Sequence, residues 1–170
     1  METVIRRNRT MNEFRKHHLK PWGVELVEKY PLIFLDNPSI RDTYKIDPNE
    51  FVSLRYGFEH DVGWASLIDE LASNGTQLVT HLRVNGFPDA RINGFICKEK
   101  FGTLRWQGDA NLPKPFSTLW YSFTNHIEEK SASICEVTGQ YGQLCRSKSG
   151  WVKTLCKTEA EKLGYTPCEN

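Results

Sequence analysis

The stretch from Cys135 to Glu159 constrains the fold most, because it has the spacing of a zinc ribbon. A four-ligand ribbon reads C-x2-C, then roughly 15 to 20 residues, then a second C-x2-C. Here Thr138 stands in the second ligand position after Cys135, and Glu159 stands in the second position after Cys156. The pattern therefore predicts a small C-terminal zinc-ribbon-like module that retains half of the usual thiolate ligands.

The other cysteines leave two interpretations of this module open. A structural zinc needs four ligands, mostly thiolate or imidazole, and Cys145 and Cys168 could complete a rearranged all-thiolate site. In the interpretation that we favour, packing by Tyr141, Trp151 and Leu155 replaces the metal, the cysteines are small buried hydrophobes, and no cofactor is bound. The candidate zinc ligands are Cys135, Cys145, Cys156, Glu159 and Cys168.

Composition and charge are those of an ordinary globular chain. The 170 residues are 39% hydrophobic and 25% charged, which is enough for one domain with a core. The formal net charge is +1, so no overall field recruits nucleic acid or an anionic membrane. The sequence has no signal-type apolar run and no stretch near the roughly 20 apolar residues that a membrane span needs. We expect a soluble cytosolic protein with reduced cysteines and no membrane partner.

Hydrophobic periodicity predicts several helices and one antiparallel hairpin. In the clearest helix, apolar residues recur at i, i+3, i+4 and i+7 after Asp61, a credible N-cap, and Asn74-Gly75 ends the pattern. The segment KEKFG, residues 98–102, separates two short apolar runs and suits a tight reversal with a basic tip. Helices segregated from an antiparallel hairpin favour an α+β fold, in which a small sheet packs with several helices.

These patterns also predict the organisation of the chain. We expect a flexible basic tail over residues 1–12, an α+β core domain over 13–134, and the ribbon-like module with a terminal helix over 135–170. Turn residues predict a long connection over residues 32–50. The predicted helices span residues 21–30, 62–73, 115–134 and 156–163, and the predicted hairpin strands span residues 92–97 and 103–106. Residues 76–84 fit either a strand or a helical turn, and of the two we favour the strand.

Several strings of this sequence occur in a specific order. They are YGFEHDVGWASLIDEL, KEKFGTLRW, and CEVTGQYGQLC followed by GWVKTLC. Together, over about residues 30–160, they resemble a family of uncharacterised proteins carried by tailed bacteriophages and prophages. The resemblance implies a phage accessory protein in the host cytoplasm, without implying a reaction. The chain departs from the family at Thr138 and Glu159, where the family has metal-type ligands.

The predicted hairpin is the main candidate for a binding surface. Its lysines and arginine bracket two aromatic residues, an arrangement that could place cations on phosphates and a ring on a base. Because side chains alternate along a strand, Lys98 and Lys100 are expected to share a face. In the alternative interpretation, the basic turn is solvated and Trp106 belongs to the core. The candidate ligand- or partner-binding residues are Lys98, Lys100, Phe101, Arg105, Trp106, His60 and Trp64.

Two functions from different classes fit this sequence. The first is a phage accessory binding protein that inhibits or redirects a host factor, such as a host-defence or nucleic-acid enzyme. It would act by protein binding or by sequestering an anionic nucleotide. In this hypothesis the protein forms a homo-oligomer. The alternative is a ribbon-type nucleic-acid-binding protein. Its candidate phosphate-binding residues are Arg146, Lys148, Lys153 and Lys157.

No complete catalytic set is present in the sequence. Metal-dependent hydrolysis would need convergent carboxylates or histidines, and no nucleotide-binding loop or metalloprotease motif occurs. Cys97 with His81 or with His126 is conceivable as a nucleophile and its base, if the fold brings them together. We therefore expect a binding protein rather than an enzyme.

Overall fold

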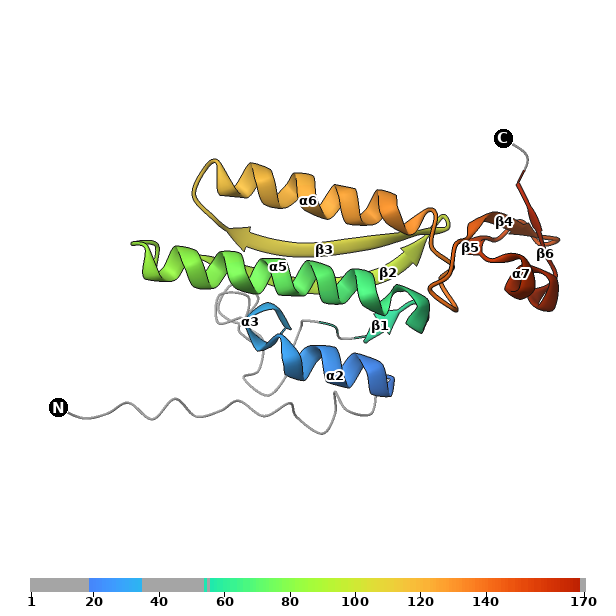
Figure 1. Ribbon diagram of the computed structural model, residues 1–170, viewed down its shortest axis with the longest axis horizontal. Coiled ribbons are helices and arrows are strands. Elements are labelled where there is room, and N and C mark those ends of the chain that lie inside the picture. Colours follow the sequence, from blue (N-terminus) through green and yellow to red (C-terminus); the bar gives the residue numbers. More distant parts are fainter. Residues whose placement is uncertain (1–18, 35–53, 55, 169–170) are drawn as a thin grey trace.

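The computed structural model describes residues 19–34, 54 and 56–168, with the exception of the Phe95 side chain (Figure 1). The fold is α+β, as the sequence predicts, and within the described ranges it has two three-stranded sheets. No helix in these ranges is long and apolar enough to cross a membrane. The elements are α2 (Pro21–Lys29), α3 (Pro31–Phe34), β1 (Phe58–Glu59), the 3-10 turn η1 (Val62–Trp64), α5 (Ala65–Val84), β2 (Arg91–Lys100), β3 (Thr103–Asn111), α6 (Phe116–Ser131), β4 (Gln143–Ser147), β5 (Val152–Leu155), α7 (Lys157–Leu163) and β6 (Tyr165–Pro167).

The first sheet contains the hairpin and has the order β1-β2-β3. Strand β1 is parallel to β2, and β2 is antiparallel to β3. Helix α6 lies along β3, the outer strand (Figure 1). The amide of Leu104 donates to Ser131 Oγ at 2.8 Å, and the amide of Trp106 donates to Glu128 Oε1 at 2.7 Å. Side chains of α6 therefore occupy hydrogen-bond positions along the edge of this sheet.

The main core lies where the helices pack against this sheet. The buried residues of α5 recur every three or four positions, so they form one stripe along the helix that faces the core. A Cβ at Gly75 would lie only 3.0 Å from the Trp120 ring and 3.0 Å from Ile33 Cδ1, so glycine allows α5 to approach both neighbours closely. The buried residues of α5 are Leu67, Ile68, Leu71, Ala72, Gly75, Val79 and Leu82.

The C-terminal module, residues 135–168, has a second, smaller core. Its sheet has the order β5-β4-β6 with both pairings antiparallel. Helix α7 follows β5 and ends at Gly164, which has the left-handed φ of 73° that favours glycine. Figure 1 shows the module beside the tip of the β2–β3 hairpin. The buried apolar residues of this core are Cys135, Cys145, Leu155 and Ala160.

The structure corrects the prediction for the middle of the chain. Residues 76–84, predicted as a strand, continue helix α5, and Asn74-Gly75 lies inside that helix. The buried stripe continues through Val79 and Leu82, so packing outweighs the weak local signal of the glycine. Asp61 precedes the 3-10 turn but makes no capping hydrogen bond with its side chain, and its Oδ1 instead accepts from Lys20 Nζ at 2.6 Å.

The other predicted elements are confirmed with shifted ends. The predicted helices 21–30, 115–134 and 156–163 correspond to α2, α6 and α7. The hairpin exists with longer strands and a two-residue turn at Phe101-Gly102. Pro31, expected to end the first helix, begins the short helix α3. The tail 1–12 and most of the predicted connection, residues 35–50, lie outside the described residues.

Candidate binding groove

The 3-10 turn η1, which leads into α5, packs at the boundary with the C-terminal module. Gly63 N donates to the carbonyl oxygen of Glu136 at 2.8 Å, and Trp64 Nε1 donates to the carbonyl oxygen of Ile134 at 2.7 Å. A Cβ at Gly63 would contact the carbonyl oxygen of Cys135 and would lie 2.5 Å from Gly139 N. Only glycine therefore fits here without moving backbone.

The hairpin tip is the second contact between the main domain and the module. Thr154 Oγ1 donates to the carbonyl oxygen of Gly102 at 2.6 Å, and this hydrogen bond is buried. A Cβ at Gly102 would clash with the Leu144 side chain. Phe101 and Gly102 have φ values of 56° and 80°, as a tight two-residue turn requires. Three of the strings noted in the sequence therefore meet at one junction.

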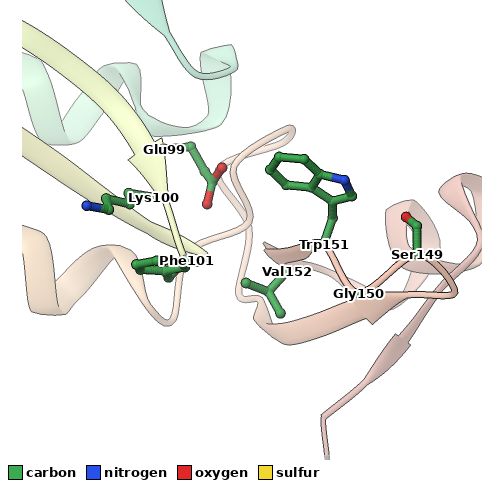
Figure 2. A pocket seen from close by; sticks show the side chains of 7 residues that line it. All are labelled: Glu99, Lys100, Phe101, Ser149, Gly150, Trp151 and Val152. Carbon is green, nitrogen blue, oxygen red and sulfur yellow. The ribbon is translucent and has the colours of Figure 1, made fainter.

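An open groove lies between the hairpin tip and the β4–β5 turn. Its volume is about 490 Å³, and Figure 2 shows residues from both sides lining it. Phe101 and Trp151 are each 72% exposed, an unusual state for large aromatic side chains. We call this feature the binding groove, and its lining residues are Glu99, Lys100, Phe101, Ser149, Gly150, Trp151 and Val152.

The charges around the hairpin are divided between the two faces of its strands. Figure 2 shows the Glu99 carboxylate directed toward the module and the Lys100 ammonium directed away from it. Lys98 is paired across the strands with Arg105, so both lie on the same face as Lys100. Arg105 Nη1 lies 3.7 Å from the carboxylate of Glu128. The predicted shared face of the two lysines fits this register, and although Lys100 is one of the residues that line the groove, its ammonium is directed away from the module.

Burial removes three of the predicted binding residues from the surface. Trp64 is fully buried, and His60 and Trp106 are also buried. Trp106 packs on Phe34 with ring centroids 5.9 Å apart. Trp64 and Trp106 belong to the main apolar core, and His60 is a buried polar residue whose ring lies 5.7 Å from the Trp64 ring. Of the predicted set, Phe101 and Lys100 are exposed and line the groove.

Cys97 has a histidine neighbour that differs from the two expected ones. Its Sγ lies 3.5 Å from His60 Nε2, and His60 Nδ1 lies 2.8 Å from the carbonyl oxygen of Asp61. This geometry places the ring proton on Nδ1 and leaves Nε2 to accept from the thiol. Burial lowers the pKa of His60 to about 4 and raises the pKa of Cys97. The pair is therefore neutral and buried, which is unsuitable for a thiolate nucleophile.

At the zinc-ribbon positions, the thiols of Cys135 and Cys156 take part in hydrogen bonds. Burial raises the pKa of Cys135, but hydrogen bonds from Thr138, Cys156 and Val137 outweigh it, so the pKa lies below its usual value. Thr138 Oγ1 donates to Cys156 Sγ at 3.8 Å. Within the described ranges, no group of three or more His, Cys, Asp or Glu side chains could hold a metal ion.

The other candidate ligands and packing residues of the module have distinct places. Glu159 pairs with Lys162 at 3.5 Å on α7, and burial raises the pKa of Cys145. Cys168 follows β6, where its amide donates to the carbonyl oxygen of Leu144 at 2.9 Å. Trp151 and Tyr141, expected to pack inside the module, are both exposed, whereas Leu155 is buried as expected.

The basic residues of the nucleic-acid hypothesis are also separated. Lys153 Nζ binds Glu136 Oε2 at 2.7 Å, and Glu136 is 1% exposed, so this lysine has a structural partner. Lys157 lies on α7, 4.0 Å from Glu161. Arg146 and Lys148 are exposed on β4 and in the following turn.

Sequence reasoning missed Glu99 and assigned Trp151 to the wrong environment. Strand alternation separates Glu99 from Lys98 and Lys100, and this signal was available in the predicted hairpin. The approach of the β4–β5 turn to the hairpin tip is a long-range contact, so local sequence gave no indication of it.

The geometry defines a small α+β protein with an open groove, lined in part by two exposed aromatic residues, at the junction of its two cores. Comparisons with family models, with curated proteins and with solved structures found no match to this chain.

Proposed function

We propose that this protein is a phage accessory binding protein that captures a host factor through the binding groove and thereby inhibits or redirects it. The carrying observation is the pair of exposed rings, Phe101 and Trp151, on opposite sides of the groove. Aromatic residues of this kind dominate the binding energy of many protein interfaces. The proposal places this action in the host cytoplasm.

The backbone at the hairpin tip supports this proposal. Phe101 has a φ of 56°, which is unfavourable for a bulky residue. Strained positions concentrate at sites of function, where the surrounding structure holds them. Here the Gly102 amide donates to Glu99 Oε1 at 2.6 Å, and the Gly102 carbonyl accepts from Thr154. The ring is therefore presented by a turn that is tied on both sides, which lowers the entropic cost of binding.

A second candidate function is nucleic-acid binding by the outer face of the hairpin. Among the described residues, Lys98 and Lys100 form no ion pair, and neither do Arg146 and Lys148. Unpaired cations are free to contact phosphates. This candidate uses a surface on the other side of the hairpin from the groove carboxylate.

Affinity capture from infected or defence-carrying host cells tests the first candidate. We expect the wild-type chain to retain one protein in stoichiometric amount, Trp151→Ala to lose it, and Tyr141→Ala to retain it. Tyr141 is the matched control because it is 78% exposed and does not line the groove. Equal capture by all three chains would contradict the proposal.

A salt titration with a single-stranded oligonucleotide tests the second candidate. Binding that weakens steeply with salt and is lost in the Lys98→Glu, Lys100→Glu double variant would support it. Absence of binding at low salt would remove it.

A further inference from the structure

We infer that the binding groove receives a cationic side chain, arginine or lysine, of a partner polypeptide. The cation lies on the indole of Trp151 and pairs with the carboxylate of Glu99, while Phe101 lines the groove on the hairpin side. This inference rests on the proposed function, because it names the chemistry of the partner at the same groove.

The carboxylate of Glu99 is the first observation. It is directed toward the module in Figure 2, where the Trp151 indole lies on the other side of the groove. The Gly102 amide donates to its Oε1 at 2.6 Å, which fixes the orientation of the carboxylate. Among the described residues, Glu99 forms no ion pair. The groove therefore presents an oriented negative charge that has no ion-pair partner within the described part of the chain.

The neighbouring lysines do not neutralise this carboxylate by direct contact. Lys100 follows Glu99 in β2 and projects from the opposite face. Lys153 lies closest to another acid, with its ammonium 2.7 Å from Glu136 Oε2, and it interacts with Glu99 only through longer-range electrostatics. A partner that brings its own cation would therefore match the charge inside the groove.

The aromatic walls are the second observation. Tryptophan is the best ring for a cation, and arginine also stacks on its flat face. Lys100 Nζ already lies 5.3 Å from the centroid of the Phe101 ring, on the hairpin side. Trp151 has no such neighbour among the described residues, so its indole is the ring that remains open to a cation from a partner.

The same charge argues against a nucleotide in the groove. A phosphate placed between the two walls would meet the Glu99 carboxylate, and like charges repel. The groove volume of about 490 Å³ suits a few side chains of a partner rather than a whole folded element. The cationic side chain would thus be one anchor in a wider interface.

Selection from a random peptide library on the immobilised full-length chain tests this inference. We expect the selected peptides to share an arginine or a lysine. Their binding should weaken at least about tenfold in Glu99→Gln and in Trp151→Ala, and should be unchanged in Tyr141→Ala. Glu99→Gln is the sharpest variant, because its amide oxygen can still accept from Gly102 N while the charge is removed.

Tryptophan fluorescence locates the bound peptide. Trp64, Trp106 and Trp120 are buried and Trp22 is half-buried, so quenching by acrylamide reports mainly on Trp151. A selected peptide should protect this fluorescence in the wild-type chain, and Trp151→Phe should remove the protected signal while keeping a ring in place.

The outcomes separate the inference from the proposed function. Acidic or uncharged selected peptides, or full binding by Glu99→Gln, would overturn the cationic anchor. Protection of the Trp151 fluorescence from acrylamide by AMP would also overturn the cationic anchor. If the captured host protein still depends on Trp151 in any of these cases, the proposed function survives. If the library yields no peptide and no host protein is captured, both fail.

Discussion

The two cores of this molecule differ in composition and in how they are held. The main domain has an extended apolar core built from Trp64, Leu67, Ile127 and many similar side chains. The C-terminal module has a small core in which two of the four buried apolar residues are cysteines. A core of that size contributes little burial, so the module depends on its hydrogen bonds to the main domain. The binding groove lies at the junction, and its shape therefore depends on this attachment.

The largest expected effect comes from Gly63→Ala, which tests the attachment directly. The added Cβ would contact backbone of residues 135–139, so the module or the start of α5 must move. We expect a loss of about 3 kcal/mol or more in the free energy of unfolding, measured by urea denaturation.

The matched variant Gly75→Ala lies inside the main core. Its Cβ would meet only side-chain atoms at 3.0 Å, and alanine gains about 1 kcal/mol of helix propensity. We expect a smaller loss than for Gly63→Ala. Equal losses would show that the module is no more sensitive than the main core.

The pH dependence of stability tests the main core. Burial lowers the pKa of His60 from 6.5 to about 4, so between these values the unfolded chain binds more protons at this site than the folded chain. The free energy of unfolding is therefore highest, with respect to His60, above pH 6.5. It decreases as the pH falls, and the loss reaches about 3 kcal/mol near pH 4.

We expect His60→Gln to remove this slope from the pH profile of unfolding. Burial also raises the pKa of Glu136, so this carboxyl contributes to the pH profile of both chains. The difference between the variant and the wild-type chain at each pH therefore isolates the effect of His60. Parallel profiles for the two chains between pH 4 and 6.5 would contradict the prediction.

The ion pair of the module gives an intermediate effect. In Lys153→Met the buried carboxylate of Glu136 loses its partner, and we expect a loss of about 2 kcal/mol at pH 7. The double variant Lys153→Met, Glu136→Gln should recover part of this loss, because no charge remains buried. Thermal unfolding of the single and the double variant measures this recovery. A double variant that is less stable than Lys153→Met would contradict the prediction.

The smallest expected effect comes from the contact between the module and the hairpin tip. Thr154→Val removes a buried hydrogen bond to Gly102, with an expected loss of about 1 kcal/mol. Trp151 should then become easier to quench, because the two walls of the groove are less firmly connected. Thr166→Val is the control, since that hydroxyl makes an exposed hydrogen bond at 3.4 Å. Equal quenching of both variants would show that this hydrogen bond does not shape the groove.

The sequence predicted much of the fold because several of its signals are local. The periodicity of α6, the KEKFG reversal and the glycine after α7 each depend on neighbouring residues, and each element is present. The strand prediction for residues 76–84 was wrong because the deciding interactions are distant. Gly75 looks like a stop until Trp120 and Ile33 are seen packed against it.

The candidate site was predicted only in part. Phe101 was identified from the hairpin, since a bulky residue beside the turn glycine is a local feature. His60 was a candidate binding residue and is buried, and Trp106 is buried in agreement with the alternative interpretation that it belongs to the core. The resemblance to phage proteins and the function drawn from it stay predictions. The proximity of Glu99 to Trp151 follows from the docking of two cores, which no local pattern encodes.

The hydrogen bonds from α6 to the outer strand limit how a partner can approach. The amides of Leu104 and Trp106 already donate to Ser131 and Glu128, so they are not free to pair with an incoming strand. Extension of the sheet at this part of β3 is therefore blocked, which protects the hairpin from edge-to-edge aggregation. A partner that contacts this part of β3 must be recognised through side chains rather than by strand addition.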